Sequence, residues 1–168
     1  MGFLCLDNLV ARSDRWKVVF DRTGRIEGIL GKSWQDRPSP DVRTQYLERF
    51  NGVWHQITHV AILVKRGQPL RAIHYLEELR NDTVEIAGLR LGLRSDNFRD
   101  VDSFPAAFRR RLEKTLMARA EKGEILITLK VATLLFFDEA EKIERKLGLS
   151  SASALRVKML DYLALFEQ

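Results

Sequence analysis

Apolar residues recur every three or four positions along residues 42–64, and this period constrains the fold more than any other feature of the sequence. The stripe consists of Val42, Tyr46, Phe50, Val53, Ile57, Val60 and Val64. Side chains at this spacing share one face of an α-helix. Asp41 stands just before the stripe, where an acidic group suits the partial positive charge of the free N–H groups. The sequence therefore predicts a long helix with one buried face.

A second long helix is predicted to follow at once. Gly67 ends the first helix, and Pro69 suits the first position of the next, where its missing N–H costs nothing. The inner stripe of this helix consists of Ala72, Leu76, Leu79, Thr83 and Ile86. Because only a few residues connect the two helices, they must pack antiparallel.

Three further helices are expected in the C-terminal half of the chain. The first runs from Ser103, a candidate N-cap, to Gly123. The second, residues 125–147, is apolar nearly all round in its first half and should be the central, most buried helix. The last begins after Ser150 or Ser151, either of which can cap it. Five helices with short connections predict a bundle.

The N-terminal end of the chain is expected to form a small group of β-strands. Short apolar runs at 3–10, 16–20 and 26–30 indicate strands, and Asp21–Gly24 has the composition of a tight turn. A strand group of this size is marginal alone and must pack on something.

A linker is expected between these strands and the helices, because residues 31–40 are rich in glycine, serine and proline. We therefore divide the chain into residues 1–33, a β-strand segment, and residues 34–168, a helical domain. The predicted fold class is mainly α, a bundle of about five helices with a small N-terminal strand remnant.

Charge, cysteine content and hydropathy limit the kinds of ligand and the cellular compartment that fit this chain. The net charge is +5, from 28 basic and 23 acidic residues that are mostly interspersed, which indicates an anionic ligand only weakly. Cys5 is the only cysteine, so an intramolecular disulfide is excluded and a reducing compartment fits. No apolar run reaches the roughly 20 residues of a membrane helix. We expect a cytoplasmic protein without a membrane span.

Asp7 is the first candidate for chemistry, because a carboxylate inside an apolar run conflicts with strand propensity. One interpretation places Asp7 and Asn8 in a bend or on an exposed edge. The other makes Asp7 a metal-binding carboxylate held on a rigid strand.

Other polar groups of the helices can be interpreted either as ordinary surface residues or as parts of a binding site. His55 and His59 share a helix face and could chelate one metal ion, but nearby residues supply no further ligand. The favoured interpretation is therefore that they are two polar residues beside the buried stripe. Lys65 and Arg66 suit the negative end of their helix and could also bind phosphate. The run Arg109–Arg111 lacks interleaved aromatic residues, so binding of nucleic acid is the least favoured function.

A series of segments in the first half of the chain resembles the second half of small bacterial nucleotidyltransferases, the group that includes antibiotic-modifying enzymes. The segments are LCLDNLV, VVFDRTGRIEGIL, a proline-rich linker, ERFNGVWHQITHVAILVKRG and QPLRAIHYLEELRND. The resemblance implies a catalytic sheet like that of DNA polymerase β. There, two carboxylates of a GS…DxD element and a third on a neighbouring strand bind two Mg²⁺ ions, which activate an acceptor hydroxyl for attack on a nucleoside triphosphate.

The resemblance also implies roles for individual residues. Asp7 would correspond to the third carboxylate, a catalytic metal ligand, and Lys65 and Arg66 would face the triphosphate. The substrate-binding residues would be Trp54, His55, Glu77 and Arg80. The GS and DxD segments should lie upstream of Asp7, where this sequence has neither, so two of the three expected carboxylates are missing. We therefore predict that the chain alone transfers no nucleotide.

Two functions follow as expectations. The first is a nucleotidyltransferase-like protein that retains the helical substrate-binding half and binds an acceptor or a nucleotide, with Mg²⁺ and a nucleoside triphosphate required only where a complete site forms. The second is a helical interaction or oligomerisation module without a small-molecule site, as in toxin–antitoxin pairs. Its partner would be a second copy of the chain or a nucleotidyltransferase chain, because unprotected strand edges invite pairing.

Overall fold

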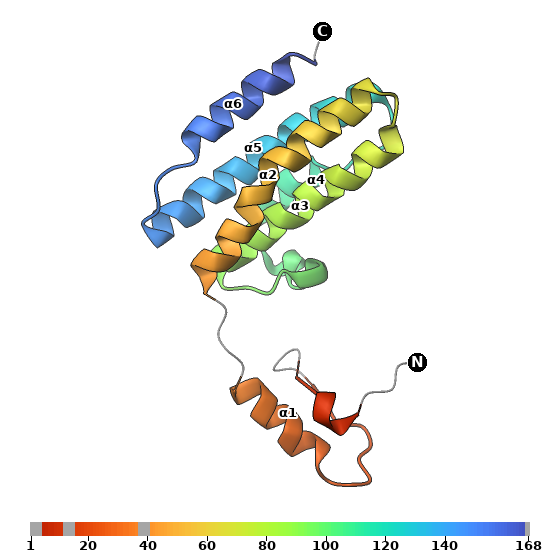
Figure 1. Cartoon of the computed structure of the whole chain (residues 1–168), viewed down its shortest axis with the longest axis vertical. Helices are drawn as coiled ribbons and strands as arrows, with labels where there is room; N and C mark the ends of the chain where they lie inside the picture. Colours follow the sequence, from red (N-terminus) through yellow and green to blue (C-terminus); the bar gives the residue numbers. More distant parts are fainter. Residues whose placement is uncertain (1–4, 12–15, 37–40, 167–168) are drawn as a thin grey trace. The chain divides into compact units, whose positions relative to one another are not determined.

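The computed structural model describes residues 5–11, 16–36 and 41–166, and it is mainly helical, as expected (Figure 1). The helices are α1 (Ile26–Gln35), α2 (Val42–Lys65), α3 (Pro69–Leu91), α4 (Ala106–Glu113), α5 (Lys122–Leu147) and α6 (Ser153–Ala164). Short 3₁₀ turns occur at Leu6–Asn8, Asp96–Phe98 and Val101–Ser103. The chain divides into two compact units, Met1–Pro40 and Asp41–Gln168, which we describe separately.

The expected helix pair is confirmed. The Asp41 carboxylate accepts the backbone N–H groups of Arg43 at 3.2 Å and Thr44 at 3.1 Å, which caps the start of α2. Gly67, with a φ of 68°, turns the chain after α2, and Pro69 is the first residue of α3. Figure 1 shows that α2 and α3 lie side by side and run in opposite directions.

Helix α5 is the central helix, as predicted. Its inward residues pack against α2 and α3 in one core that also receives side chains from α6. The completely buried members of this core on α5 include Ile125, Leu129, Phe136, Phe137, Ala140 and Ile143. In Figure 1, α3 and α5 run one way and α2 and α6 the other. The long helices of this unit therefore form a bundle in which α5 contacts each of the others.

The helix expected between Ser103 and Gly123 is shorter than predicted. Helix α4 ends at Glu113, Ser103 lies in a 3₁₀ turn before it, and Gly123 belongs to the first turn of α5. The Thr115 hydroxyl donates a 2.6 Å hydrogen bond to the Leu112 carbonyl, and the Thr115 N–H donates to the same oxygen at 2.9 Å. A hydroxyl that bonds nearby backbone competes with helix continuation, and residues 114–121 consequently form a loop.

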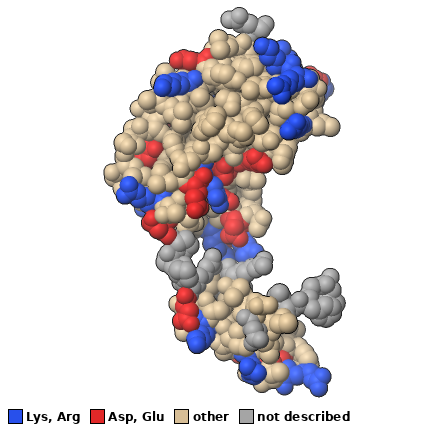
Figure 2. Space-filling model, viewed as in Figure 1, with Lys and Arg blue, Asp and Glu red and all other residues tan. Residues whose placement is uncertain are grey.

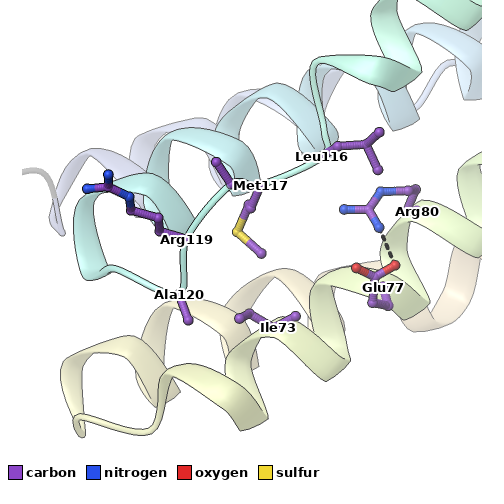
Figure 3. A pocket seen from close by; sticks show the side chains of 8 residues that line it. Ile73, Glu77, Arg80, Leu116, Met117, Arg119 and Ala120 are labelled. Atoms are coloured by element: carbon purple, nitrogen blue, oxygen red, sulfur yellow. Dashed lines mark hydrogen bonds and ion pairs between the residues drawn. The ribbon is translucent and has the colours of Figure 1, made fainter.

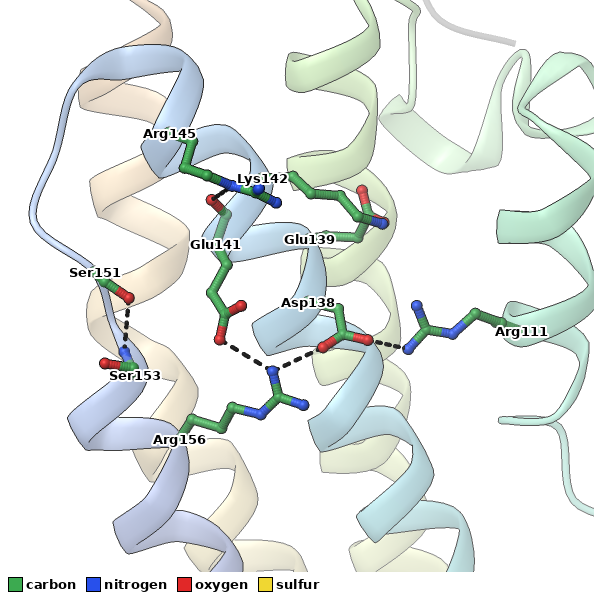
Figure 4. A network of polar contacts seen from close by, with 9 residues as sticks. All are labelled: Arg111, Asp138, Glu139, Glu141, Lys142, Arg145, Ser151, Ser153 and Arg156. Atoms are coloured by element: carbon green, nitrogen blue, oxygen red, sulfur yellow. Dashed lines mark hydrogen bonds and ion pairs between the residues drawn. The ribbon is translucent and has the colours of Figure 1, made fainter.

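The start of α6 is held by a side chain of α5 and by a serine. Ala152 occupies the N-cap position, one residue after the expected Ser151, and the Ser151 hydroxyl accepts the Ser153 N–H at 3.2 Å (Figure 4). The Ala152 N–H donates a 2.9 Å hydrogen bond to Oε2 of Glu144, a buried carboxylate of α5. This bond satisfies a further backbone donor at the start of the helix.

A polar network on the surface joins α4, α5 and α6 (Figure 4). The Arg156 guanidinium of α6 lies 2.8 Å from one oxygen of Asp138 and 3.0 Å from the carboxylate of Glu141. The other oxygen of Asp138 pairs with Arg111 of α4. Arg111 is thus already paired with a carboxylate of α5, which weakens the case for a free basic cluster at Arg109–Arg111.

Charges of both signs share the visible face of the molecule in Figure 2. This distribution agrees with the interspersed charges of the sequence and shows no extended single-sign field on that face. Among the described residues, no helix is both long and apolar enough to cross a lipid bilayer.

The N-terminal unit contains a helix where a strand was expected. Residues 26–30, predicted as a strand, form the first half of α1. The turn Asp21–Gly24 is present, with Gly24 at a φ of 64°, and the Asp21 carboxylate accepts the Ile26 N–H at 2.8 Å. Ile26, Ile29, Leu30 and Ser33 fall at helical spacing and are half-buried. These residues therefore form a helix and not a strand, because their buried side chains follow the helical period of 3.6 residues and the Asp21 carboxylate caps the start of the helix.

The remaining strand predictions also fail where the structure describes them. Leu6–Asn8 is a 3₁₀ turn, and residues 16–20 contain no strand. Residues 3, 4 and 12–15 lie outside the described part of the chain. The predicted linker begins too early, since α1 continues to Gln35, and residues 37–40 lie outside the described residues. The expected boundary at 33/34 falls inside α1, whereas the compact units divide after Pro40.

Candidate functional site

Asp7, the predicted catalytic carboxylate, lies in the 3₁₀ turn Leu6–Asn8. The Asn8 N–H donates to the Cys5 carbonyl at 3.0 Å, and this bond closes the turn. This is the bend that the sequence left open as one of two interpretations, and not the rigid strand of a metal-binding sheet. Nowhere in the described ranges do three His, Cys, Asp or Glu side chains come together to hold a metal ion.

Glu77 and Arg80, two of the predicted substrate-binding residues, line a cavity between α3 and the loop that joins α4 to α5 (Figure 3). The cavity has a volume of about 300 Å³. Its lining residues are Ile73, Glu77, Arg80, Leu116, Met117, Ala118, Arg119 and Ala120. The structure thus brings one predicted pair to a hollow in the surface of the bundle.

Arg80 is held in place on the wall of this cavity. Arg80 is only 4% exposed, which is rare for an arginine. Its Nε donates to Oγ1 of Thr115 at 2.9 Å, and Nη2 donates to the Thr115 carbonyl at 2.5 Å. The third partner of the guanidinium is the carboxylate of Glu77, which pairs with Nη1. A guanidinium with three such partners has one fixed orientation.

Glu77 is the exposed member of this pair. Its side chain is 48% exposed, and its Oε2 atom accepts the Arg80 bond (Figure 3). In the described part of the chain, no hydrogen bond or ion pair reaches the Oε1 atom of Glu77. The carboxylate therefore has an acceptor atom that a ligand can reach.

The rest of the cavity wall is largely apolar. Ile73 and Met117 are half-buried on opposite sides, and Leu116 is exposed at the mouth (Figure 3). Arg119 is the second cation of the lining, and its guanidinium lies 3.6 Å from Glu121, a neighbouring carboxylate outside the cavity. This combination of an apolar wall and a few polar groups can bind and orient a small molecule, but it contains no nucleophile with an adjacent base.

Trp54 and His55, the other predicted substrate-binding residues, lie in a different place. They belong to a ring cluster of Trp54, His55, His59, His74 and Tyr75 on the outer face of α2 and α3. The rings of His55 and His59 are 3.9 Å apart between centroids, and Tyr75 packs edge-on against His59 at 5.0 Å. Trp54 is 51% exposed. None of these residues lines the α3 cavity.

Positively charged groups lie near His59 in the ring cluster. The pKa of His59 is lowered, chiefly by partial loss of hydration and then by His55, Arg71 and Arg66. His74 differs, because its Nε2 lies 3.2 Å from Oε1 of Glu78. The ring cluster thus contains one histidine with a carboxylate partner and two histidines that face each other.

Lys65 and Arg66, the predicted triphosphate ligands, lie at the C-terminal end of α2. Arg66 is the C-cap residue, and the Lys65 ammonium lies 6.0 Å from the centre of the Phe166 ring. The negative end of the helix dipole is at this position, which favours the two cations and opposes a phosphate. Neither residue lines the α3 cavity.

Several residues of these sites were not identified from the sequence, and Thr115 and Tyr75 are the most informative of them. Thr115 fixes Arg80, but the region was predicted to be helical, so no signal indicated a loop that returns to α3. Tyr75 sits between His59 and His74, and only the antiparallel packing of α2 and α3 reveals that position.

No protein-family model matches the sequence, and no curated protein matches it either.

Proposed function

We propose that residues 41–168 form a helical binding module, similar to the substrate-binding half of nucleotidyltransferases, that takes a small acceptor molecule in the α3 cavity. The observation that supports this proposal is the position of Glu77 and Arg80. Both residues were selected from the sequence alone, and both line the same cavity.

The chemistry of the cavity favours an acceptor with amino or hydroxyl groups on a partly apolar body. The Oε1 atom of Glu77 accepts a hydrogen bond from such a group, while Arg80 stays fixed by Thr115 and keeps Glu77 in place. Ile73 and Met117 supply apolar contact on either side. Arg80 is held by the hydroxyl and the carbonyl of Thr115, so it keeps the Glu77 carboxylate in position before the ligand binds.

The same proposal holds that this chain alone transfers no nucleotide. Transfer to an acceptor hydroxyl needs two metal ions and several carboxylates in one place. The described residues contain no such cluster. Binding of Mg²⁺ and a nucleoside triphosphate then requires a second polypeptide that supplies the catalytic sheet. We expect this complex to form in the cytoplasm.

Calorimetric titration tests the proposal. The wild-type chain is titrated with an aminoglycoside and, separately, with ATP and Mg²⁺. We expect saturable binding of the aminoglycoside, which carries many amino and hydroxyl groups, and no turnover of ATP. Glu77→Gln should weaken the binding, because the amide lowers the negative charge at the cavity. Glu78→Gln is the matched control, since Glu78 pairs with His74 on the other side of α3.

Three results would count against this function. They are absence of binding, equal weakening by the two substitutions, and ATP-dependent modification of the aminoglycoside by the chain alone.

The second candidate function is an interaction module, and the N-terminal unit favours it. Val10, Val19 and Phe20 are exposed at 61%, 91% and 76%, although each is apolar. Val19 and Phe20 are adjacent in the chain, and neighbouring exposed apolar side chains favour a surface that a partner covers. The partner that this function implies is a second copy of the chain or a nucleotidyltransferase chain.

Light scattering distinguishes this candidate from the first. An interaction module should give a particle of twice the chain mass or more, and Val19→Ser with Phe20→Ser should return it to the monomer. Ile127→Ser, which changes an exposed apolar residue of α5, is the control and should leave the mass unchanged. A wild-type chain that is monomeric at all concentrations would exclude self-association.

A further inference from the structure

His55 and His59 stand on the outer face of α2 with their rings nearly in contact. They are one helical turn apart, and their ring centroids are separated by 3.9 Å. Tyr75 of α3 packs edge-on against both rings, at 5.0 Å from His59 and 6.4 Å from His55. Contact with a residue of another helix restricts the orientations that the two imidazoles adopt, and the spacing of four residues places both rings on one side of α2.

The position of the pair suits a metal ion. A histidine binds metal through a neutral ring nitrogen, so protonation competes with binding, and the site should fill best at neutral or higher pH. His59 is half-buried against Tyr75 of α3, whereas His55 is exposed, so the pair has one side packed on the protein and one side open to solvent.

We propose that His55 and His59 form a two-histidine site for a divalent cation of the zinc, nickel and cobalt class. Two imidazoles in successive turns of a helix can bind one such ion at Zn–N distances of about 2.0–2.1 Å. Imidazole nitrogen suits these ions and not Mg²⁺, which prefers oxygen ligands. The site is thus distinct in place from the α3 cavity and in chemistry from the Mg²⁺ ligand predicted at Asp7.

Water or a ligand from outside completes the coordination of the ion. Among the residues that the structure places, no third His, Cys, Asp or Glu joins the pair. An ion held by two protein ligands keeps open positions, as catalytic metal sites do and closed structural sites do not. His55 is exposed to solvent, so the open positions are accessible.

His74 supplies a matched control. It contacts the same tyrosine, with its ring centroid 5.5 Å from that of Tyr75, but its Nε2 lies 3.2 Å from the Glu78 carboxylate. It therefore differs from His59 in having a charged partner and no facing imidazole. Cys5 is exposed and is a second potential ligand for these ions, so the experiment uses a Cys5→Ser background.

The experiment is a titration of the full chain with ZnCl₂ and with NiCl₂ at neutral pH in a buffer that does not bind metal. We expect one saturable site per chain. His55→Ala and His59→Ala should each abolish it, and His74→Ala should retain it. Circular dichroism without metal checks that each variant keeps its helical content, and His59→Gln repeats the test with a polar side chain of closer shape.

A second readout locates the ion directly. With paramagnetic Co²⁺, the imidazole proton signals of His55 and His59 should shift together and those of His74 should shift less. The proposal is overturned by absence of saturable binding, by binding that survives in His59→Ala and His59→Gln, or by binding that depends equally on His74. It does not depend on the α3 cavity, so its outcome is independent of the proposed function.

Discussion

The hydroxyl of Tyr46 donates a 2.5 Å hydrogen bond to Oε1 of Glu144, which lies 98 residues further along the chain. The second oxygen of Glu144 accepts the Ala152 N–H at 2.9 Å. Tyr46 belongs to α2, Glu144 to α5, and Ala152 precedes α6. One buried carboxylate therefore connects three helices, and both of its oxygen atoms are satisfied.

Removal of the Tyr46 hydroxyl should destabilise the bundle. Tyr46→Phe keeps the packing of the ring but leaves Oε1 of the buried carboxylate without a donor. The expected loss in the free energy of unfolding is about 1–3 kcal/mol, measured by urea denaturation. Tyr162→Phe is the control, because in the described residues the Tyr162 hydroxyl makes no hydrogen bond. If both variants unfold at the same urea concentration, the bond contributes nothing.

Stability should also fall at alkaline pH because of the same hydroxyl. Burial and the Glu144 carboxylate raise the pKa of Tyr46 far above its ordinary value of about 10. The unfolded chain then loses this proton first, so the contribution is complete below pH 10 and is lost as the pH rises above it. The slope for one such group is about 1.4 kcal/mol per pH unit. Tyr46→Phe should lose stability less steeply than the wild type; parallel curves would contradict this.

Two helical glycines should respond in opposite ways to substitution by alanine. A Cβ at Gly88 would lie 2.6 Å from Cβ of Ser95 and 3.0 Å from the Leu93 carbonyl, whereas a Cβ at Gly52 meets nothing within 4 Å. Gly52→Ala should stabilise α2 by up to about 1 kcal/mol, the difference in helix propensity. Gly88→Ala should lower the midpoint of thermal unfolding. Stabilisation by both would show that the close approach of residues 93–95 to α3 is absent.

Substitution of Arg80 should loosen the loop of residues 114–121. Arg80→Met removes three bonds, two of them to Thr115, and leaves the Thr115 carbonyl without this donor. The expected loss in the free energy of unfolding is about 1–3 kcal/mol. Amide hydrogen exchange should become faster in the loop. Arg119→Met, at an exposed arginine of the same loop, should change neither quantity, and equal effects of the two variants would refute the anchoring role.

The long helices were predictable because their signals are local and repeated. The stripe from Val42 to Val64, the Asp41 cap and Pro69 agree on the same boundaries. Helix α1 was missed because Ile26–Leu30 is too short to separate a strand from a helix by period alone. The end of α4 was missed because a threonine bond to backbone, and not a glycine or proline, stops that helix.

The candidate site was predictable only in part, for a related reason. The i,i+3 spacing of Glu77 and Arg80 indicates their ion pair, and the structure contains it. The sequence could not show that Trp54 and His55 lie apart from this pair, because their separation depends on which flank of α3 faces α2. The spacing of residues shows which side chains share a face of a helix. It does not show which other helix or loop packs against that face.

The most direct test of the central claim is a two-dimensional amide NMR titration of the full chain with an aminoglycoside. The account predicts that signals of Glu77, Arg80, Met117 and Ala120 move together and saturate, and that Glu77→Gln weakens the response while Glu78→Gln leaves it intact. Shifts confined to the ring cluster at Trp54 and His59, or no shift at any concentration, would contradict it.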